Sequence, residues 1–432
     1  MIRSLLVILA LLAAPLRAET ADTALARDAF RFGFPIYEMA RTRAAALQRQ
    51  PVNLLVHRRT LADESSRDVT TPNNDTLYSS AWLDLSAGPV ILTLPALPNR
   101  YHSAALMDLW TDNFAILGTR ASLGKGGRFA IAGPGWTGAR PDGTVLVRSP
   151  TNDVWLLIRT LIDGPADVDA ARTAQLGYGL QASVALSPGR PSPLPAQPDA
   201  ATFIDSVGAA LARGPVPPQH RARLGRLAAT GLISGASWAS LSPSQQAVWS
   251  ANFATFTAEL RGGIAATGTV VNGWSYPNAI IGDFGQDDTT RARVALGGLA
   301  ALPPVEAMYL TAVSDSTGKP LNGSKSYRLR IPTGGVPAKA FWSLTMYEIA
   351  ADGRLFFAAD PLKRFAIGDR TPGLKVGPNG EIDLLIGNRQ PADTSNWLPA
   401  PAGPFRTVLR AYLPKGELLT GKWKLPALEV IP

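Results

Sequence analysis

The side chains of this chain that could do chemistry are carboxylates, amides, phenols and indoles, and they are concentrated in two stretches. Residues 72–84 read Pro-Asn-Asn-Asp-Thr-Leu-Tyr-Ser-Ser-Ala-Trp-Leu-Asp, and residues 396–405 read Asn-Trp-Leu-Pro-Ala-Pro-Ala-Gly-Pro-Phe. Carboxylates can transfer protons, whereas amides, phenols and indoles orient a ligand by hydrogen bonding and stacking. The two stretches therefore predict a site that either binds a ligand or converts one.

Asp108 is the first acid/base candidate, because the residues around it, 106–107 and 109–110, are apolar. A carboxylate in such a segment is expected to be buried, and burial raises the pKa of a carboxyl group toward the range that a general acid or base needs. An ion pair with an arginine such as Arg120 or Arg410 is the structural alternative, and the sequence leaves both open.

Asp75 is the candidate for the second carboxylate of an acid/base pair. It follows Asn73 and Asn74, and this combination is also typical of a turn in which a side chain caps the backbone. Asp75 is therefore predicted either to cap a turn or to complete the pair with Asp108.

Further candidates lie on two predicted strands, residues 76–84 and 341–348, which each alternate polar and apolar side chains. We expect Tyr78, Tyr347 and Arg410 to orient polar groups of a ligand. Ordinary outer β faces, with Tyr and Thr chosen for strand propensity, are the alternative. The candidate substrate-binding residues are Asn73, Asn74, Tyr78, Tyr101, Trp342, Thr345, Tyr347, Asn396, Trp397, Arg410 and Tyr412, with Trp342 and Trp397 as walls.

Hydrophobic spacing predicts the elements that position these residues. Residues 20–49 indicate two helices interrupted at Pro35, and residues 167–265 are also helical in pattern. Strands are expected over residues 76–85, 90–94, 101–110, 145–148 and 154–162, and again over 327–331, 340–349, 382–386 and 407–413.

This order of elements predicts an α+β, mainly β fold with two β-sandwich or jelly-roll-like domains joined by a helical segment. The expected parts are an N-terminal β domain with leading helices over residues 19–165, a helical connecting region over 166–304 and a C-terminal β domain over 305–432. No repeat of fixed period is visible in the sequence.

Composition excludes several kinds of site. The chain has no cysteine, so thiol nucleophiles, iron–sulfur clusters and cysteine-ligated zinc are ruled out. Its three histidines, His57, His102 and His220, are far apart in the sequence, and no calcium-binding loop of alternating aspartates occurs. We therefore expect neither a metal nor a redox cofactor. The scattered basic residues give no stripe suited to nucleic acid.

The first 18 residues resemble a secretory signal peptide, with Arg3, an apolar run over residues 5–14 and Ala18 before the expected cleavage point. A short N-terminal anchor is the alternative. No later stretch contains the roughly 18 successive apolar residues of a membrane-spanning helix. We therefore expect a periplasmic or secreted protein without integral membrane insertion.

Several long motifs resemble those of the tandem DUF1254/DUF1214 proteins. The motifs are residues 72–84, Arg100-Tyr101, residues 108–120, Asn272-Gly273-Trp274, residues 341–347, residues 396–405 and residues 410–412. The resemblance implies two β-sandwich-like domains joined by helices, in a family found among exported bacterial proteins. It carries over no catalytic residue, since no general activity is established for the family. His102 and residues 287–291 depart from the usual pattern.

The sequence therefore predicts an exported enzyme, a hydrolase or lyase that uses carboxylate acid/base chemistry on a small or oligomeric ligand, carbohydrate-like or envelope-derived. A noncatalytic periplasmic binding or envelope-assembly protein is the alternative, and a homo-oligomer with aromatic subunit contacts is a third. All three predict surfaces of aromatic side chains, but the first two require candidates from both halves of the chain to meet in one hollow.

Overall fold

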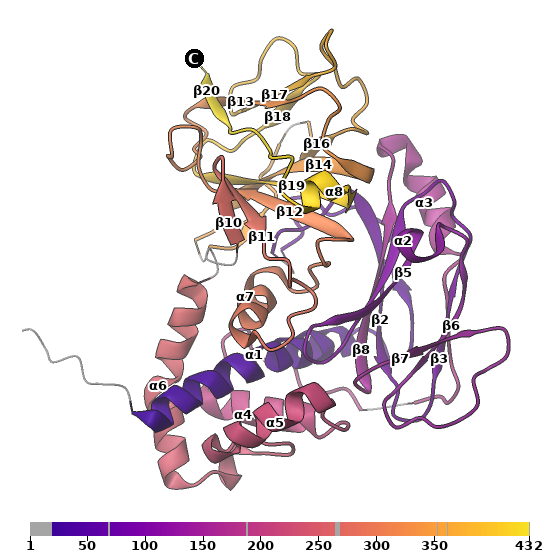
Figure 1. Ribbon diagram of the computed structural model, residues 1–432, viewed down its shortest axis with the longest axis vertical. Coiled ribbons are helices and arrows are strands. Elements are labelled where there is room, and N and C mark those ends of the chain that lie inside the picture. The colour runs from indigo at the N-terminus through magenta and orange to yellow at the C-terminus, as the bar shows by residue number, and fades with distance from the viewer. Residues whose placement is uncertain are drawn as a thin grey trace, which may run out of the picture.

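The computed structural model describes residues 20–67, 70–186, 189–263, 268–351, 353–360 and 362–431. The predicted signal peptide, residues 1–18, lies outside the described residues. The fold is α+β and mainly β, as predicted, and the strands of the described residues form four sheets (Figure 1). No helix in this described part is long and apolar enough to cross a membrane.

The N-terminal β domain consists of two packed sheets. Its inner sheet, which faces the C-terminal domain, has the order β1 (Val56–His57), β2 (Thr76–Asp84), β8 (Asp153–Leu161), β4 (His102–Met107) and β5 (Asn113–Gly118). Its outer sheet has the order β7 (Val145–Arg148), β6 (Gly127–Ala132), β3 (Val90–Leu94) and β9 (Gly179–Ala182). Alternating side chains such as Leu83, Leu92 and Ile158 fill the core between the two sheets.

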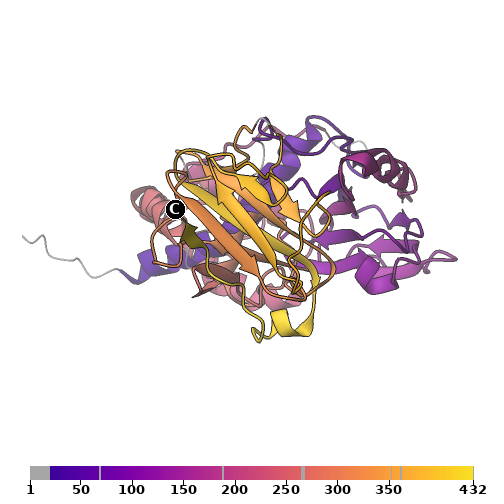
Figure 2. The ribbon, with the colours of Figure 1, turned by 90° about the horizontal axis from the view of Figure 1, so that it is seen from above.

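The C-terminal β domain is a second pair of sheets. Its inner sheet has the order β10 (Gly268–Val271), β11 (Trp274–Pro277), β12 (Ala307–Ala312), β19 (Phe405–Pro414), β14 (Ala338–Ile349) and β15 (Leu355–Phe356), and β16 (Ala366–Gly368) also pairs with β14. Its outer sheet has the order β18 (Trp397–Pro399), β17 (Ile382–Gly387), β13 (Ser326–Ile331) and β20 (Glu429–Ile431). Figure 2 shows the orange and yellow strands of this domain side by side.

A helical layer forms the third part of the molecule. The helix α1 (Ala21–Leu47) packs against α4 (Ala200–Leu211), α5 (Pro218–Leu227), α6 (Pro243–Gly262) and α7 (Asp288–Gly298), as Figure 1 shows. The apolar sides of these helices share one core with Trp82 of the N-terminal inner sheet and with Trp110 in the turn between β4 and β5. Part of that sheet is thus covered by helices, and the rest is left for the C-terminal domain.

Two sequence expectations differ from this arrangement. The two helices predicted around Pro35 are one continuous helix, since buried packing on four neighbouring helices holds α1 straight through a residue that lacks an N–H donor. The region 166–304 is not helical throughout: β9 completes the N-terminal outer sheet, and β10 and β11 belong to the C-terminal inner sheet. Alternation was too short in these strands to reveal them.

The two β domains have the same topology, although the sequence shows no regular repeat. In each, the first central strand (β2 or β12) is followed by an outer strand (β3 or β13), and then by an inner strand (β4 or β14). Later in each half, two outer strands pair in parallel, β6 with β7 and β17 with β18. The last inner strand, β8 or β19, then inserts between the first two inner strands of its sheet. A short helix, α3 (Val168–Gln175) or α8 (Gly416–Leu419), then leads to an outer edge strand (β9 or β20).

Equivalent glycines end equivalent edge strands. Gly118 at the end of β5 lies opposite Ser103, and Gly368 at the end of β16 lies opposite Ser343. A Cβ atom at Gly118 would lie 2.4 Å from the carbonyl oxygen of His102, and one at Gly368 would lie 2.2 Å from that of Trp342. Both positions therefore require glycine for the same close approach of two backbones.

We predict that Gly118→Ala and Gly368→Ala each lower the free energy of unfolding by about 3 kcal/mol, because the clash is with backbone that cannot move aside. Urea unfolding would measure the loss. The matched control is Gly135→Ala, where an added Cβ meets no atom within 4 Å. If both variants were as stable as Gly135→Ala, neither position would require glycine; unequal losses at Gly118 and Gly368 would contradict their equivalence.

Candidate functional site at the domain interface

Three neighbouring strands of each inner sheet place a tyrosine, an arginine and a serine side by side. Arg159 on β8 lies between Tyr78 on β2 and Ser103 on β4. In the C-terminal inner sheet, Arg410 on β19 lies between Tyr309 on β12 and Ser343 on β14. We call these the N-terminal row and the C-terminal row. They occupy equivalent strands of the two domains.

Equivalent carboxylates cross the interface in both directions. Asp75, three residues before Tyr78, accepts a hydrogen bond from the Ser343 hydroxyl at 2.6 Å and lies 3.5 Å from the Arg370 guanidinium. Glu306, three residues before Tyr309, accepts a hydrogen bond from the Tyr101 hydroxyl at 2.8 Å and from Arg120 at 2.5 Å. Each carboxylate therefore pairs with side chains of the opposite domain.

Arg120 and Arg370 are themselves equivalent, since each stands two residues after the glycine that ends its edge strand, β5 or β16. The rings of Tyr101 and Phe341, two residues before Ser103 and Ser343, also meet, with centroids 5.7 Å apart. Contacts in which equivalent groups exchange roles are characteristic of twofold-symmetric interfaces. The two halves of this chain form such an interface internally.

The two row arginines donate across the interface as well. Arg159 Nη2 donates to the carbonyl oxygen of Ala300 at 2.9 Å, and Arg410 Nη2 donates to that of Thr71 at 3.2 Å. Ala300 precedes β12 and Thr71 precedes β2, and their φ angles are +68° and +56°. Such angles are uncommon outside glycine, so each arginine ends on a strained turn of the opposite half.

Arg410 is the centre of a wider hydrogen-bond network. Its Nη1 donates to the Thr345 hydroxyl at 2.7 Å and its Nη2 to the Tyr347 hydroxyl at 2.6 Å, while that hydroxyl donates to the Pro72 carbonyl at 2.6 Å. Asn73 Nδ2 donates to the Tyr412 hydroxyl at 2.8 Å. The interface thus brings together these sequence-predicted residues: Asn73, Asp75, Tyr78, Tyr101, Thr345, Tyr347, Arg410 and Tyr412.

Burial and charge give the network its electrostatic character. Arg159 and Arg410 are 5% and 3% exposed. Burial alone lowers the pKa of Arg159, yet the phenols of Tyr78 and Tyr309 raise it to a net value above the usual one. Burial raises the pKa of Tyr347 to about 12, and it raises the pKa of Tyr412 well above the usual value of a phenol. At neutral pH the arginines are charged and the phenols keep their protons.

Tyr78 and Tyr309, which flank the arginines in the two rows, are half-buried, whereas the arginines are buried. The guanidinium of Arg159 lies over the Tyr78 ring, 5.6 Å from its centroid. Arg159 Nη1 is buried and has no hydrogen-bond partner among the described residues. This atom is a donor that the surrounding protein leaves unused.

Asp108 lies in a different network, in the turn between β4 and β5. Its carboxylate accepts hydrogen bonds from the backbone amides of Trp110 at 2.9 Å and Asp112 at 3.0 Å. The arginine of this network is Arg291, which pairs with Asp112 at 2.7 Å, and not Arg120 or Arg410 as the sequence suggested. Arg120 and Arg410 are held at the domain interface instead. Asp75 also lies at that interface, so the two carboxylates of the predicted Asp108–Asp75 pair belong to separate contact networks.

The remaining predicted residues also lie apart from the interface network. Trp342 points into the core of the C-terminal β domain. Asn396 Nδ2 donates to the Lys375 and Asp383 carbonyls at 2.8 and 3.0 Å, and Trp397 Nε1 donates to the Gly387 carbonyl at 3.1 Å. The 396–405 stretch therefore closes an edge of the C-terminal sandwich. Asn74 is half-buried in the turn before β2.

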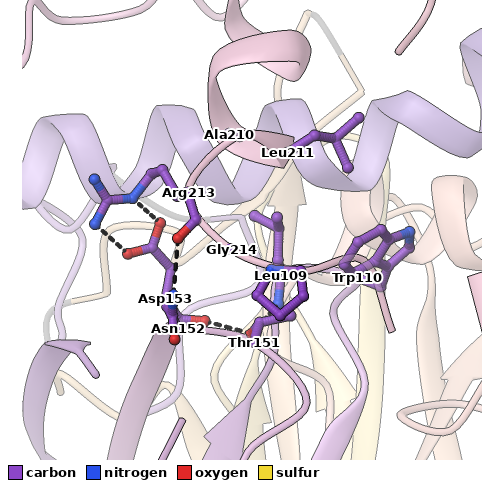
Figure 3. Close-up of a pocket in the computed structure, with 10 residues that line it drawn as sticks. Leu109, Trp110, Thr151, Asn152, Asp153, Ala210, Leu211, Arg213 and Gly214 are labelled. Carbon is purple, nitrogen blue, oxygen red and sulfur yellow. Dashed lines mark hydrogen bonds and ion pairs between the residues drawn. The ribbon is translucent and has the colours of Figure 1, made fainter. Parts of the chain in front are cut away.

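Two small hollows lie elsewhere. One, of about 10 Å³, lies next to Leu109, Trp110 and Thr151, beside the Asp153–Arg213 ion pair (Figure 3). The other, of about 20 Å³, is lined by Met346, residues 358–360, Arg364, Phe365 and residues 399–400. Volumes of this size hold at most a water molecule, so neither hollow is a pocket for an organic ligand.

Comparison with known proteins agrees with the two-domain architecture. The family model for DUF1254, a protein of unknown function, matches residues 52–182, and the model for DUF1214, also a protein of unknown function, matches residues 306–416. The chain belongs to the tandem DUF1254/DUF1214 family. Each match falls on one of the two β domains, so the two families describe two versions of one topology.

A solved structure extends this similarity over the whole molecule. The VPA0106 protein from Vibrio parahaemolyticus is 25% identical, with a TM-score of 0.74 over 95% of this chain and 100% of that chain. A putative uncharacterized protein from Burkholderia cenocepacia is 13% identical, with a TM-score of 0.47 over 93% of this chain and 88% of that one. No curated protein matches the chain.

The sequence analysis did not identify half of the interface network. The residues it missed are Ser103, Arg159, Glu306, Tyr309, Ser343 and Arg370, and it named Arg120 only as a partner of Asp108. Short paired motifs could have found them: Asp-Thr-Leu-Tyr at 75–78 with Glu-Ala-Met-Tyr at 306–309, Gly-Thr-Arg at 118–120 with Gly-Asp-Arg at 368–370, and Ile-Arg-Thr-Leu at 158–161 with Leu-Arg-Ala-Tyr at 409–412. The spacing between motifs differs in the two halves, so a search for a fixed period misses them.

Asp108 supplies a prediction about stability and pH. Burial, and after it the charge of Asp112, raise the pKa of Asp108 to about 7, while Arg291 acts in the opposite direction. A carboxyl group that binds its proton more tightly when folded stabilises the fold below about pH 4, and that stability is lost as the pH rises toward 7. Asp108→Asn keeps an oxygen acceptor for the two backbone amides and removes the buried charge.

We therefore expect Asp108→Asn to raise the free energy of unfolding by about 1–3 kcal/mol at about pH 8, and by much less at about pH 5. Urea unfolding at both pH values would measure the difference. Asp142→Asn, at an exposed loop carboxylate, is the control and should be nearly neutral. A variant that is less stable than the unmodified protein at both pH values would refute this assignment of Asp108.

Proposed function

We propose that this protein binds a small, polar organic ligand between its two β domains. The observation that supports the proposal is the meeting of the N-terminal and C-terminal rows, which gathers buried cations and protonated phenols below the half-buried Tyr78 and Tyr309. Ligand sites are commonly found at domain interfaces, with a few convergent polar groups set among aromatic walls.

Entry of the ligand would involve the two half-buried tyrosines. The arginines below them are almost inaccessible, so Tyr78 and Tyr309 must rotate before a ligand can reach the guanidinium groups. Side-chain rotation of half-buried residues is fast and inexpensive compared with backbone movement. The phenols would then donate or accept hydrogen bonds at the rim, while the arginines bind the deepest polar group.

Acid/base catalysis, as a hydrolase or lyase, is the second candidate function. It is favoured by the two crossing carboxylates, Asp75 and Glu306, which lie at the edge of the same network. Asp75, with its hydrogen bond to Ser343, could accept a proton from a ligand hydroxyl or from a bound water. Loss of turnover in Asp75→Asn without loss of ligand affinity would assign this activity, whereas equal losses would indicate binding alone.

We also propose that the chain is exported and acts in the periplasm or outside the cell. The support is the sequence of residues 1–18, with Arg3, a short apolar run and Ala18. Mass spectrometry of the protein from a periplasmic fraction should find Glu19 as the first residue. A chain that keeps Met1 and stays with the cytoplasmic fraction would exclude export.

The double variant Tyr78→Phe/Tyr309→Phe tests the proposed site, because it removes the hydroxyls of the two tyrosines that flank the row arginines and keeps both rings. We expect at least one of a panel of small sugars, sugar acids, amides and carboxylic acids to raise the melting temperature of the unmodified protein. The double variant should fold with similar stability and bind that compound about tenfold more weakly.

Tyr276→Phe is the matched control for this experiment, since its hydroxyl accepts from the Leu425 amide, away from the interface. It should lose some stability but no affinity. An affinity that is unchanged in the double variant would place the ligand elsewhere and defeat the proposal. Titration calorimetry of the compound into the unmodified protein and the variants gives the dissociation constants directly.

A further inference from the structure

We infer that the ligand carries an acidic group, a carboxylate or a phosphate, which Arg159 and Arg410 receive together between the two rows. This inference rests on the proposed function and specifies the chemical class of its ligand. It is argued from the pairing of the buried charges, from the positions of the two arginines and from the donor that remains unused.

The first step is the pairing of the interface charges. Arg370 lies 3.5 Å from Asp75, and Arg120 lies 2.5 Å from Glu306, so these two arginines are neutralised across the interface. Neither Arg159 nor Arg410 has a carboxylate within 4.0 Å among the described residues, and their partners there are carbonyl and hydroxyl oxygens. Asp75 acts on Arg410 only at longer range, where its charge raises the pKa of that arginine, and its direct partners are Ser343 and Arg370.

The second step is the cost of this arrangement. A buried guanidinium without a negative partner is expensive, since hydrogen bonds to neutral oxygens replace only part of its hydration. Two such groups in one network leave an excess of positive charge at the centre of the interface. A bound anion would remove that excess, and it would do so in a region of low dielectric constant, where the attraction is strong.

The third step is geometric. Tyr78 flanks Arg159 in the N-terminal row, and Tyr309 flanks Arg410 in the C-terminal row. The hydrogen bonds from Ser343 to Asp75 and from Tyr101 to Glu306 hold the two rows against each other across the interface. Arg159 Nη1, buried and unpartnered, offers a donor there. Guanidinium groups bind carboxylate and phosphate oxygens through parallel N–H donors.

The rings of Tyr78 and Tyr309 restrict the class of ligand further. The acidic group would lie below the rings of Tyr78 and Tyr309, so whatever is attached to it must pass between two aromatic side chains. Flat or ring-shaped organic groups make favourable contacts with such walls. The inferred ligand is therefore a small organic acid with a ring next to its acidic group.

Matched pairs of probes test this inference on the unmodified protein. Benzoate and phenyl phosphate carry the two acidic groups, and benzamide is the neutral counterpart of benzoate. We expect benzoate or phenyl phosphate to raise the melting temperature and benzamide to have no effect. The anion that raises the melting temperature more identifies the acidic group. Added sodium chloride should weaken the effect only slightly, because buried charges are poorly screened.

Variants then locate the anion. Arg159→Gln should reduce the affinity for the effective anion at least tenfold, and Arg410→Lys, which keeps the charge but loses the fork, should also weaken it. The control is Arg330→Gln, which removes an exposed arginine paired with Asp383 on the C-terminal outer sheet. It should leave the affinity unchanged.

A second measurement separates anion binding from a structural role. Arg159→Met loses the hydrogen bond to Ala300, so the quantity that decides is the rise in melting temperature caused by the anion, which should vanish in this variant if Arg159 binds the anion. A lower melting temperature together with an undiminished response to benzoate and phenyl phosphate would overturn the inference. So would the absence of any response of the unmodified protein to either anion.

The two proposals can fail separately. If a neutral compound binds with a dependence on Tyr78 and Tyr309 while Arg159→Gln leaves its affinity unchanged, the interface site stands and the acidic class is wrong. If the anions bind the tyrosine double variant and Arg159→Gln as tightly as they bind the unmodified protein, both the interface site and the acidic class are excluded.

Discussion

The interaction on which this structure depends is the exchange of polar side chains between two similar β domains. Asp75 and Glu306 cross in opposite directions to bind Ser343 and Tyr101, and Arg159 and Arg410 do the same to reach carbonyl oxygens at Ala300 and Thr71. Polar contacts of this kind are directional, unlike apolar packing, and they fix the angle and register of two surfaces. The relative position of the domains follows from them.

This constraint also explains why irregular backbone is retained where it is. Thr71 and Ala300 adopt left-handed φ angles, which cost free energy in residues other than glycine. Each of these turns presents a carbonyl oxygen to a buried arginine, and a charge-assisted hydrogen bond offsets the strain. The strain and the buried charge are thus two parts of one arrangement, which occurs once in each direction.

The sequence predicted the parts of the fold that depend on local pattern. Long alternating segments such as residues 76–84 and 341–348 identified β2 and β14, and the mainly β fold with two domains followed. Short edge strands such as β9 and β10 could not be predicted, because four residues give too little alternation. Pro35 misled the helix prediction, since packing of α1 on its neighbours outweighs the loss of one backbone hydrogen bond.

The sequence likewise identified only part of the candidate site. Tyr78, Tyr347 and Arg410 were found because they stand in segments dense in polar and aromatic residues. Asp108 and Trp397 had the same local character but serve a turn and a sandwich edge, and no property of their neighbours in sequence distinguishes the two cases. Arg159 was missed because it follows a run of five apolar residues, 154–158, and only its counterpart in the other half marks it.

The shared topology has a consequence for how this molecule can change. In a symmetric pair of separate subunits, every substitution appears on both sides of the contact. Here a single polypeptide contains both sides, so one can diverge while the other is kept. The meeting of Tyr101 with Phe341 already shows this: one ring keeps a hydroxyl for Glu306, and its counterpart has none. Because both halves belong to one chain, the internal symmetry of the interface can become incomplete.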